Sequence, residues 1–173
     1  MKTMTHLLIP AIVALLVSGP AWANETIKFV KFFSANCVRT VDDLDALRMY
    51  AKLMKWEKIR KDIASLAGGK VDFAWGVRSE GQFLLIGGGS GLSDEGRKFN
   101  GCSVISKPQD ANEVGKVLKS RFKLKLIVDE VEGFTRFQQF NARVSGLPMM
   151  MNIISADDPK VRAVTLSVLF FPR

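Results

Sequence analysis

The stretch that decides the fold is Val71-Asp72-Phe73-Ala74-Trp75-Gly76-Val77, in which large apolar residues alternate with small or polar ones. Alternation with a period of two is typical of a β-strand that buries one face. Turn formers follow at residues 78–81 (RSEG), and an apolar segment returns at residues 82–86 (QFLLI). The pattern therefore predicts an antiparallel hairpin over residues 71–86.

The chain beyond this hairpin alternates between turn signals and regular elements. Residues 87–101 are rich in glycine, serine and charge, so we interpret them as a surface loop, and a third strand is expected to begin at Cys102. Asp110 as N-cap and Glu113 in a capping box predict a helix to about Phe122. Apolar stretches between turn formers then predict strands over residues 124–128, 134–144, 149–155 and 161–170.

The clearest helical pattern precedes the hairpin. Thr40 supplies an N-cap hydroxyl, and the helix is expected to run from Val41 to Leu66, before Gly68-Gly69. Residues 26–33 (TIKFVKFF) fit a strand and an amphipathic helical turn equally well. The predicted buried stripe of the helix recurs every three or four positions: Leu44, Leu47, Ala51, Met54, Ile59, Ile63 and Leu66.

The order of these elements is helix, three strands, helix and several strands. Neighbouring strands joined by short turns pair antiparallel. The sequence thus predicts an α+β fold, with a largely antiparallel sheet and two amphipathic helices packed on one face.

The N-terminus has the pattern of an export signal. Lys2 precedes an apolar stretch from Leu7 to Val17, and Ala21-Trp22-Ala23 is an A-x-A cleavage site. We predict a signal peptide over residues 1–23, cut after Ala23, and a single α+β domain over residues 24–173, located in the periplasm or secreted. No later run approaches the ~20 apolar residues of a transmembrane helix.

The composition excludes several kinds of catalytic site. The 173 residues are 47% hydrophobic and 24% charged, as expected of a globular domain, and contain a single histidine. That residue is His6, so the exported chain would lack an imidazole and with it any Ser-His-Asp triad or His-ligated metal. Without Lys2 the chain keeps 24 basic and 17 acidic residues, which favours anionic surroundings.

Cys37 and Cys102 are the two cysteines of the chain. In an oxidising compartment an even pair predicts a disulfide. Neither cysteine lies in a CxxC motif, which argues against a redox site.

Arg48, Lys52 and Lys55 follow one another at helical spacing, and Lys58, Arg60 and Lys61 extend the basic surface. We interpret the first three as a candidate binding site for an anionic component. The alternative is an ordinary solvated helix face. Nucleic acid is not expected as a partner, because no stacking aromatic residues alternate with these lysines.

Other motifs carry weaker signals. Gly87-Gly88-Gly89-Ser90-Gly91 matches no phosphate-binding pattern. Met149 and Met151 would share a strand face, where they serve either as soft copper ligands or as core filler. We assign no catalytic residue, no metal ligand and no cofactor.

A resemblance rests on Phe29, Cys37-Val38, Asp42 with Asp45, Trp56, Phe73-x-Trp75 and Gly101-Cys102-Ser103-Val104. Across roughly Phe29 to Val104, the chain resembles a group of small exported bacterial proteins with two cysteines, whose function is uncharacterised. The resemblance implies a disulfide-linked periplasmic protein, and it implies neither an active site nor a cofactor.

Three functions remain open at this point. The first is a non-enzymatic envelope protein that binds an anionic or amphiphilic component, or a partner protein. The second is an inhibitor or accessory chaperone of an exported enzyme, with the 87–101 loop as its contact. The third is a carboxylate-based hydrolase that uses residues such as Glu80, Asp94 and Glu95.

Overall fold

A computed structural model describes residues 21–59, 71–107, 109–158 and 161–172 of the chain. The predicted signal peptide lies outside the described residues, except for residues 21–23. These three residues are the first of helix α1 (Ala21–Phe33).

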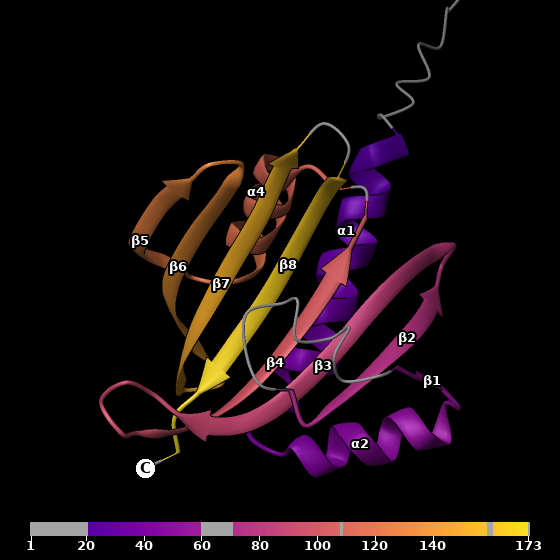
Figure 1. Ribbon diagram of the computed structural model, residues 1–173, viewed down its shortest axis with the longest axis vertical. Coiled ribbons are helices and arrows are strands. Elements are labelled where there is room, and N and C mark those ends of the chain that lie inside the picture. The colour runs from indigo at the N-terminus through magenta and orange to yellow at the C-terminus, as the bar shows by residue number, and fades with distance from the viewer. Residues whose placement is uncertain (1–20, 60–70, 108, 159–160, 173) are drawn as a thin grey trace, which may run out of the picture.

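One antiparallel sheet dominates the molecule (Figure 1). Its order is β1-β2-β3-β4-β8-β7-β6-β5, and each neighbouring pair runs antiparallel. The coarse prediction, an α+β fold with a largely antiparallel sheet, is confirmed. The strands are β1 (Glu57–Lys58), β2 (Phe73–Ser79), β3 (Gln82–Leu92), β4 (Lys98–Ser106), β5 (Lys125–Glu132), β6 (Thr135–Val144), β7 (Leu147–Asp158) and β8 (Val161–Phe170).

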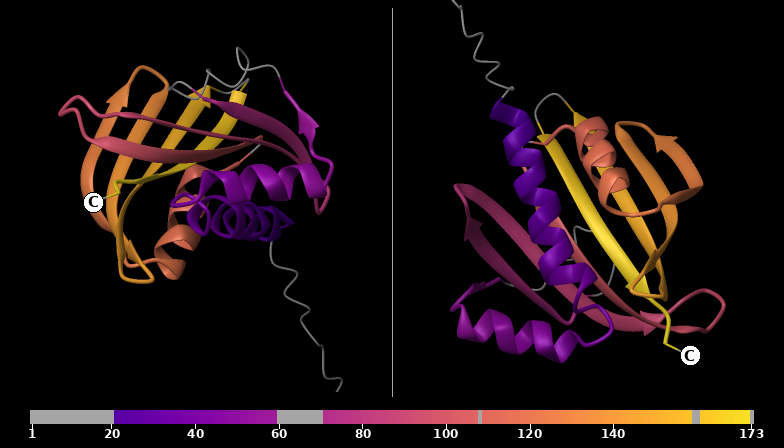
Figure 2. Two further views of the ribbon diagram at one scale, coloured as in Figure 1. Left: turned by 90° about the horizontal axis from the view of Figure 1, so that it is seen from below. Right: turned by 180° about the vertical axis from the view of Figure 1, so that it is seen from behind.

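The helices differ from the predicted arrangement. α1 contacts α4 (Ala111–Arg121), and these two helices cover one face of the curved sheet (Figure 2). The prediction of one long helix from Val41 to Leu66 is wrong. The structure has instead the short helix α2 (Leu44–Leu53), which lies across one end of the molecule. Strand β1 begins after three further residues. Residues 60–66 of the predicted helix and Gly68-Gly69 lie outside the described residues.

The segment over residues 26–33, for which strand and helix remained open, is helical. Phe29, Val30 and Phe33 are fully buried, as three- and four-residue spacing on one helix face requires. The Thr26 hydroxyl donates to Oε1 of Gln109 at 3.2 Å, which satisfies two buried polar side chains where α1 passes the start of α4.

The core lies between the helices and the inner face of the sheet. Alternate residues of the strands point into it, as the period-two pattern predicts. Met149 and Met151 are among them, so their side chains are core filler. The strands contribute Phe73, Trp75, Val77, Leu84, Ile86, Cys102, Val104, Phe140, Met149, Met151, Ile153, Val164, Leu166 and Val168.

Two tight turns have the backbone that right-twisted hairpins prefer. Glu80 and Gly81 connect β2 to β3 with φ of 49° and 86°, and Ser145 and Gly146 connect β6 to β7 with φ of 50° and 84°. Positive φ at both central residues is the requirement of a type I′ turn. Local sequence therefore determines the pairing of these strands.

The glycine-rich segment is strand and not a loop. β3 continues through Gly87 to Leu92, β4 starts at Lys98, and only residues 93–97 connect them. A Cβ added to Gly88 would lie 2.8 Å from the carbonyl oxygen of Gly101 and from the ring of Phe73. Glycine is used here because neighbouring groups approach the backbone closely.

The prediction that Asp110 is the N-cap of α4 is confirmed. Asp110 accepts hydrogen bonds from the backbone N–H of Asn112 at 2.8 Å and of Glu113 at 3.1 Å. The side chain thus satisfies two donors of the first helical turn.

The predicted disulfide is also confirmed. Cys37, in the short π-helical turn η1 (Ser34–Val38), is bonded to Cys102 in β4 across a sequence separation of 65 residues. The bond ties the end of α1 to the centre of the sheet.

Asp129 in β5 is held by β6. Arg136 donates from Nε and Nη2 at 2.8 and 2.7 Å, and Gln138 donates at 3.0 Å. These hydrogen bonds lower the pKa of Asp129 from 3.8 to about 2.

Because the folded-state pKa is lowered, the contribution to stability is present above the ordinary pKa and is lost as the pH falls toward 2. We expect an NMR titration of the Asp129 carboxyl to show a midpoint near pH 2, and Arg136→Gln to raise it toward 3.8. A wild-type midpoint at the ordinary value would contradict this assignment.

Candidate functional site

Helix α2 carries the candidate site, and its N-terminus is formed by local capping. The carboxylate of Asp43 accepts a hydrogen bond from the backbone N–H of Ala46 at 3.0 Å. Leu44, Leu47 and Ala51 form the buried face that holds the helix on the molecule. These three residues are the part of the predicted buried stripe that the structure confirms.

The helix ends in a Schellman motif with a lysine at its left-handed position. Lys55 has a φ of 53°, its N–H donates to the carbonyl of Lys52 at 3.1 Å, and the N–H of Trp56 donates to the carbonyl of Ala51 at 2.9 Å. Glycine is the usual residue at this position, because a Cβ is crowded there. Backbone of this kind is frequent at functional sites.

We expect Lys55→Gly to raise the free energy of unfolding by about 1 kcal/mol, because it removes the left-handed Cβ penalty. The matched control is Lys55→Ala, which removes the charge and keeps the Cβ, and should stay within about 0.5 kcal/mol of the wild type. Chemical denaturation of the three proteins measures both effects. Equal stability of the glycine and alanine variants would refute the role of the backbone conformation.

Aromatic rings fix the orientation of this helix end. The ring of Trp56 lies 5.7 Å from Phe32, 5.5 Å from Tyr50 and 6.2 Å from Trp75, measured between centroids. Edge-to-face and tilted contacts of this kind are the favoured aromatic geometries. Trp56 therefore links α1, α2 and β2 into one rigid platform.

The side of α2 that faces away from the core exposes large apolar residues. Met49 is 68% exposed, Leu53 78% and Met54 52%. Met54 was expected in the buried stripe, and this expectation is wrong, because the helix ends at Leu53 and the chain reverses. We call Met49, Lys52, Leu53, Met54 and Lys55 the α2 ridge.

The three predicted basic residues separate into two roles. Arg48 pairs with Asp45 at 2.5 Å and with Asp72 at 3.7 Å, and its guanidinium lies 4.6 Å from the centroid of Phe73. Arg48 thus connects α2 to the sheet.

Lys52 and Lys55 are exposed and take part in no ion pair within the described part of the chain. Lys58 is exposed in β1, whereas Arg60 and Lys61 lie outside the described residues.

Sequence reasoning found the basic residues of the ridge and missed its apolar ones. The available signal was the pair Met49 and Leu53, four residues apart and hence on one side of a helix whose other side carries Leu47 and Ala51.

The carboxylates considered for hydrolysis lie at two ends of the sheet. Glu80 is in the β2–β3 turn, and Asp94 and Glu95 follow the far end of β3. Eleven strand residues separate them, which is on the order of 35 Å in an extended chain. Glu80 therefore cannot form a catalytic pair with either of the other two, which requires about 5–10 Å.

Comparison of the chain with protein-family models, with curated proteins and with solved structures finds no match. The helices of the described segments are all too short or too polar to cross a bilayer. The described residues also contain no cluster of three or more His, Cys, Asp or Glu side chains suited to a metal ion.

Proposed function

We propose that this protein is an exported, non-enzymatic binding protein of the bacterial envelope, and that its α2 ridge contacts the surface of an anionic lipid membrane. The observation that carries the proposal is that exposed Met49 and Leu53 lie beside Lys52 and Lys55, which form no ion pair with any residue that the structure describes. Helices that bind to a membrane surface insert apolar side chains into the interfacial region, and their neighbouring basic side chains are attracted to anionic lipids.

The energetics favour a membrane surface over free solvent. A buried leucine side chain gains about 1.5–3 kcal/mol relative to an exposed one. A lysine near an anionic surface contributes about 1 kcal/mol. The excess of basic residues over the whole chain acts in the same direction.

The rigid attachment of the ridge supports the same function. Arg48 and Trp56 anchor α2 to the sheet, so that the ridge projects without needing to be ordered on binding. Preorganisation of this kind reduces the entropic cost of association.

The inhibitor or chaperone alternative is weakened, because its expected contact loop is strand. A deletion of Gly88 to Ser90 would remove paired residues from the middle of the sheet.

Co-sedimentation with phosphatidylglycerol vesicles tests the proposal, with phosphatidylcholine vesicles as the control. We expect binding to the anionic vesicles at low salt and a strong loss of binding at high salt, where exposed charges are screened. Leu53→Ser should weaken binding, and Leu126→Ser, which alters an exposed leucine on β5, should not. Absent or salt-insensitive binding would overturn the proposal.

A further inference from the structure

The outer face of the sheet, which α1 and α4 leave uncovered, carries large apolar side chains among small polar ones, whereas the open face of an antiparallel sheet is commonly polar. Figure 1 views the sheet from this side, with α1 and α4 behind the strands. A hollow of about 690 Å³ lies on it, within the usual range for small-molecule sites. Glycine and serine form much of its lining, and its apolar walls include Phe99, Phe137, Ile154 and Leu169. We call this cavity the outer hollow.

Close approach of the strands shapes this cavity. A Cβ at Gly101 would lie 3.0 Å from a methyl group of Leu169, and one at Gly91 would lie 2.9 Å from the ring of Phe99. The ring of Phe99 and the side chain of Leu169 therefore lie directly on the backbone of Gly91 and Gly101, where they form walls of the outer hollow.

Asn152 in β7 lines the outer hollow, and one of its two polar side-chain atoms lacks a hydrogen-bond partner in the described structure. The residue is 7% exposed, and its Nδ2 donates to Oγ of Ser167 in β8 at 3.2 Å. Its Oδ1 is buried and has no hydrogen-bond partner in the described structure. A buried acceptor without a partner is rare in folded proteins and calls for an external donor.

The lining also determines the charge of a suitable ligand. The described residues that line the outer hollow include no charged side chain, and the nearby carboxylate of Asp72 already accepts a hydrogen bond from the backbone N–H of Ser90 at 3.1 Å. An ionised group would lose its hydration there without gaining a counter-charge, so a neutral molecule fits best.

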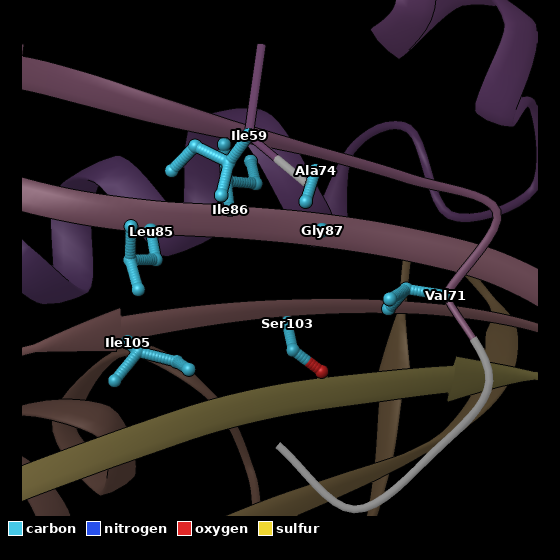
Figure 3. A pocket seen from close by; sticks show the side chains of 8 residues that line it. All are labelled: Ile59, Val71, Ala74, Leu85, Ile86, Gly87, Ser103 and Ile105. Atoms are coloured by element: carbon cyan, nitrogen blue, oxygen red, sulfur yellow. The ribbon is translucent and has the colours of Figure 1, made fainter. Parts of the chain in front are cut away.

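A smaller apolar pocket continues the cavity toward β2. It shares Val71, Gly87 and Ser103 with the outer hollow. Figure 3 shows Leu85, Ile105 and Val71 around Ser103 at this point. This smaller pocket has a volume of about 20 Å³, which suits a single small group, so an alkyl chain would lie in the outer hollow itself.

We propose that the outer hollow binds a neutral amphiphile, with its alkyl chain along the glycine-rich strands and its hydroxyl group donating to Oδ1 of Asn152. The terminal torsion of an asparagine side chain is broad, so the amide can turn toward the ligand. This site is separate from the α2 ridge and does not depend on the function proposed for it.

Titration calorimetry of the purified protein with three probes of similar chain length tests the proposal. 1-Decanol has the hydroxyl donor, decyl methyl ether has an acceptor only, and decanoate is charged. We expect 1-decanol to bind about tenfold more tightly than either of the others, because only it pairs the buried acceptor without burying a charge. No binding of 1-decanol, or equal affinities of the three probes, would overturn the proposal.

Two variants locate the site. Asn152→Leu should reduce the affinity for 1-decanol about tenfold and make the affinities for alcohol and ether equal, and circular dichroism verifies that the variant remains folded. Ser103→Leu should fill the junction of the two cavities and abolish binding, whereas Ser79→Leu, at the end of β2, is the matched control.

Unchanged 1-decanol affinity in Asn152→Leu and Ser103→Leu would contradict the assignment. The variant Lys52→Glu/Lys55→Glu should bind 1-decanol normally. A variant that no longer binds vesicles but still binds 1-decanol therefore separates the function proposed for the α2 ridge from that of the outer hollow.

Discussion

Replacing Cys37 and Cys102 together by alanine is expected to lower the free energy of unfolding by about 4 kcal/mol, because the bond closes a loop of 65 residues in the unfolded chain. An effect of this size is a large fraction of the stability of an ordinary domain. It should appear as a lower denaturant midpoint in equilibrium unfolding.

Reduction of the wild-type protein is the matched experiment. Both cysteines are buried, so a small thiol should reduce the bond only after unfolding, with a mass increase of two hydrogen atoms. The reduced wild type and the double alanine variant should then unfold at similar denaturant concentrations. A loss below about 1 kcal/mol in the variant would show that the bond contributes little to stability.

Reversal of both ridge lysines should have the largest effect on membrane binding. Lys52→Glu/Lys55→Glu is expected to weaken binding to phosphatidylglycerol vesicles by a factor of about thirty or more. Each lysine contributes about 1 kcal/mol to binding, and a loss of about 1.4 kcal/mol weakens binding tenfold. Circular dichroism and the denaturation midpoint verify that the variant remains folded.

The control carries the same change of charge on another helix. Lys116→Glu/Lys119→Glu alters two exposed lysines of α4 and should weaken vesicle binding less than about threefold. Equal losses in the two double variants would show that net charge acts without a specific surface, and would contradict the α2 ridge.

The type of most elements could be predicted because their signals are local. The hairpin over residues 71–86 depends on alternation and on Glu80-Gly81, and α4 depends on the cap at Asp110. For the candidate site, spacing identified Lys52 and Lys55. The four-residue spacing of Met49 and Leu53 also places both on one side of the helix, but it does not say which of the two apolar sides of α2 is exposed.

Two boundaries depended on contacts between distant residues. Residues 87–91 have a loop-like composition, yet they pair with β4 over their length, since the ladder and the close approach of Phe73 outweigh the low strand preference of glycine. The end of α2 at Leu53 has no glycine or proline signal, and beyond it Trp56 packs on Phe32 and Trp75.

By itself the sequence determined the alternating strands, the tight turns, the helix cap at Asp110 and a cysteine pair able to form one bond, because each depends on residues near one another or on simple counting. Tertiary structure alone decided that α1 packs beside α4, that α2 is short with an exposed apolar side, and that the glycines lie within the sheet. The physical reason is that local preferences differ by about 1 kcal/mol or less per residue, so burial against distant parts of the chain outweighs them.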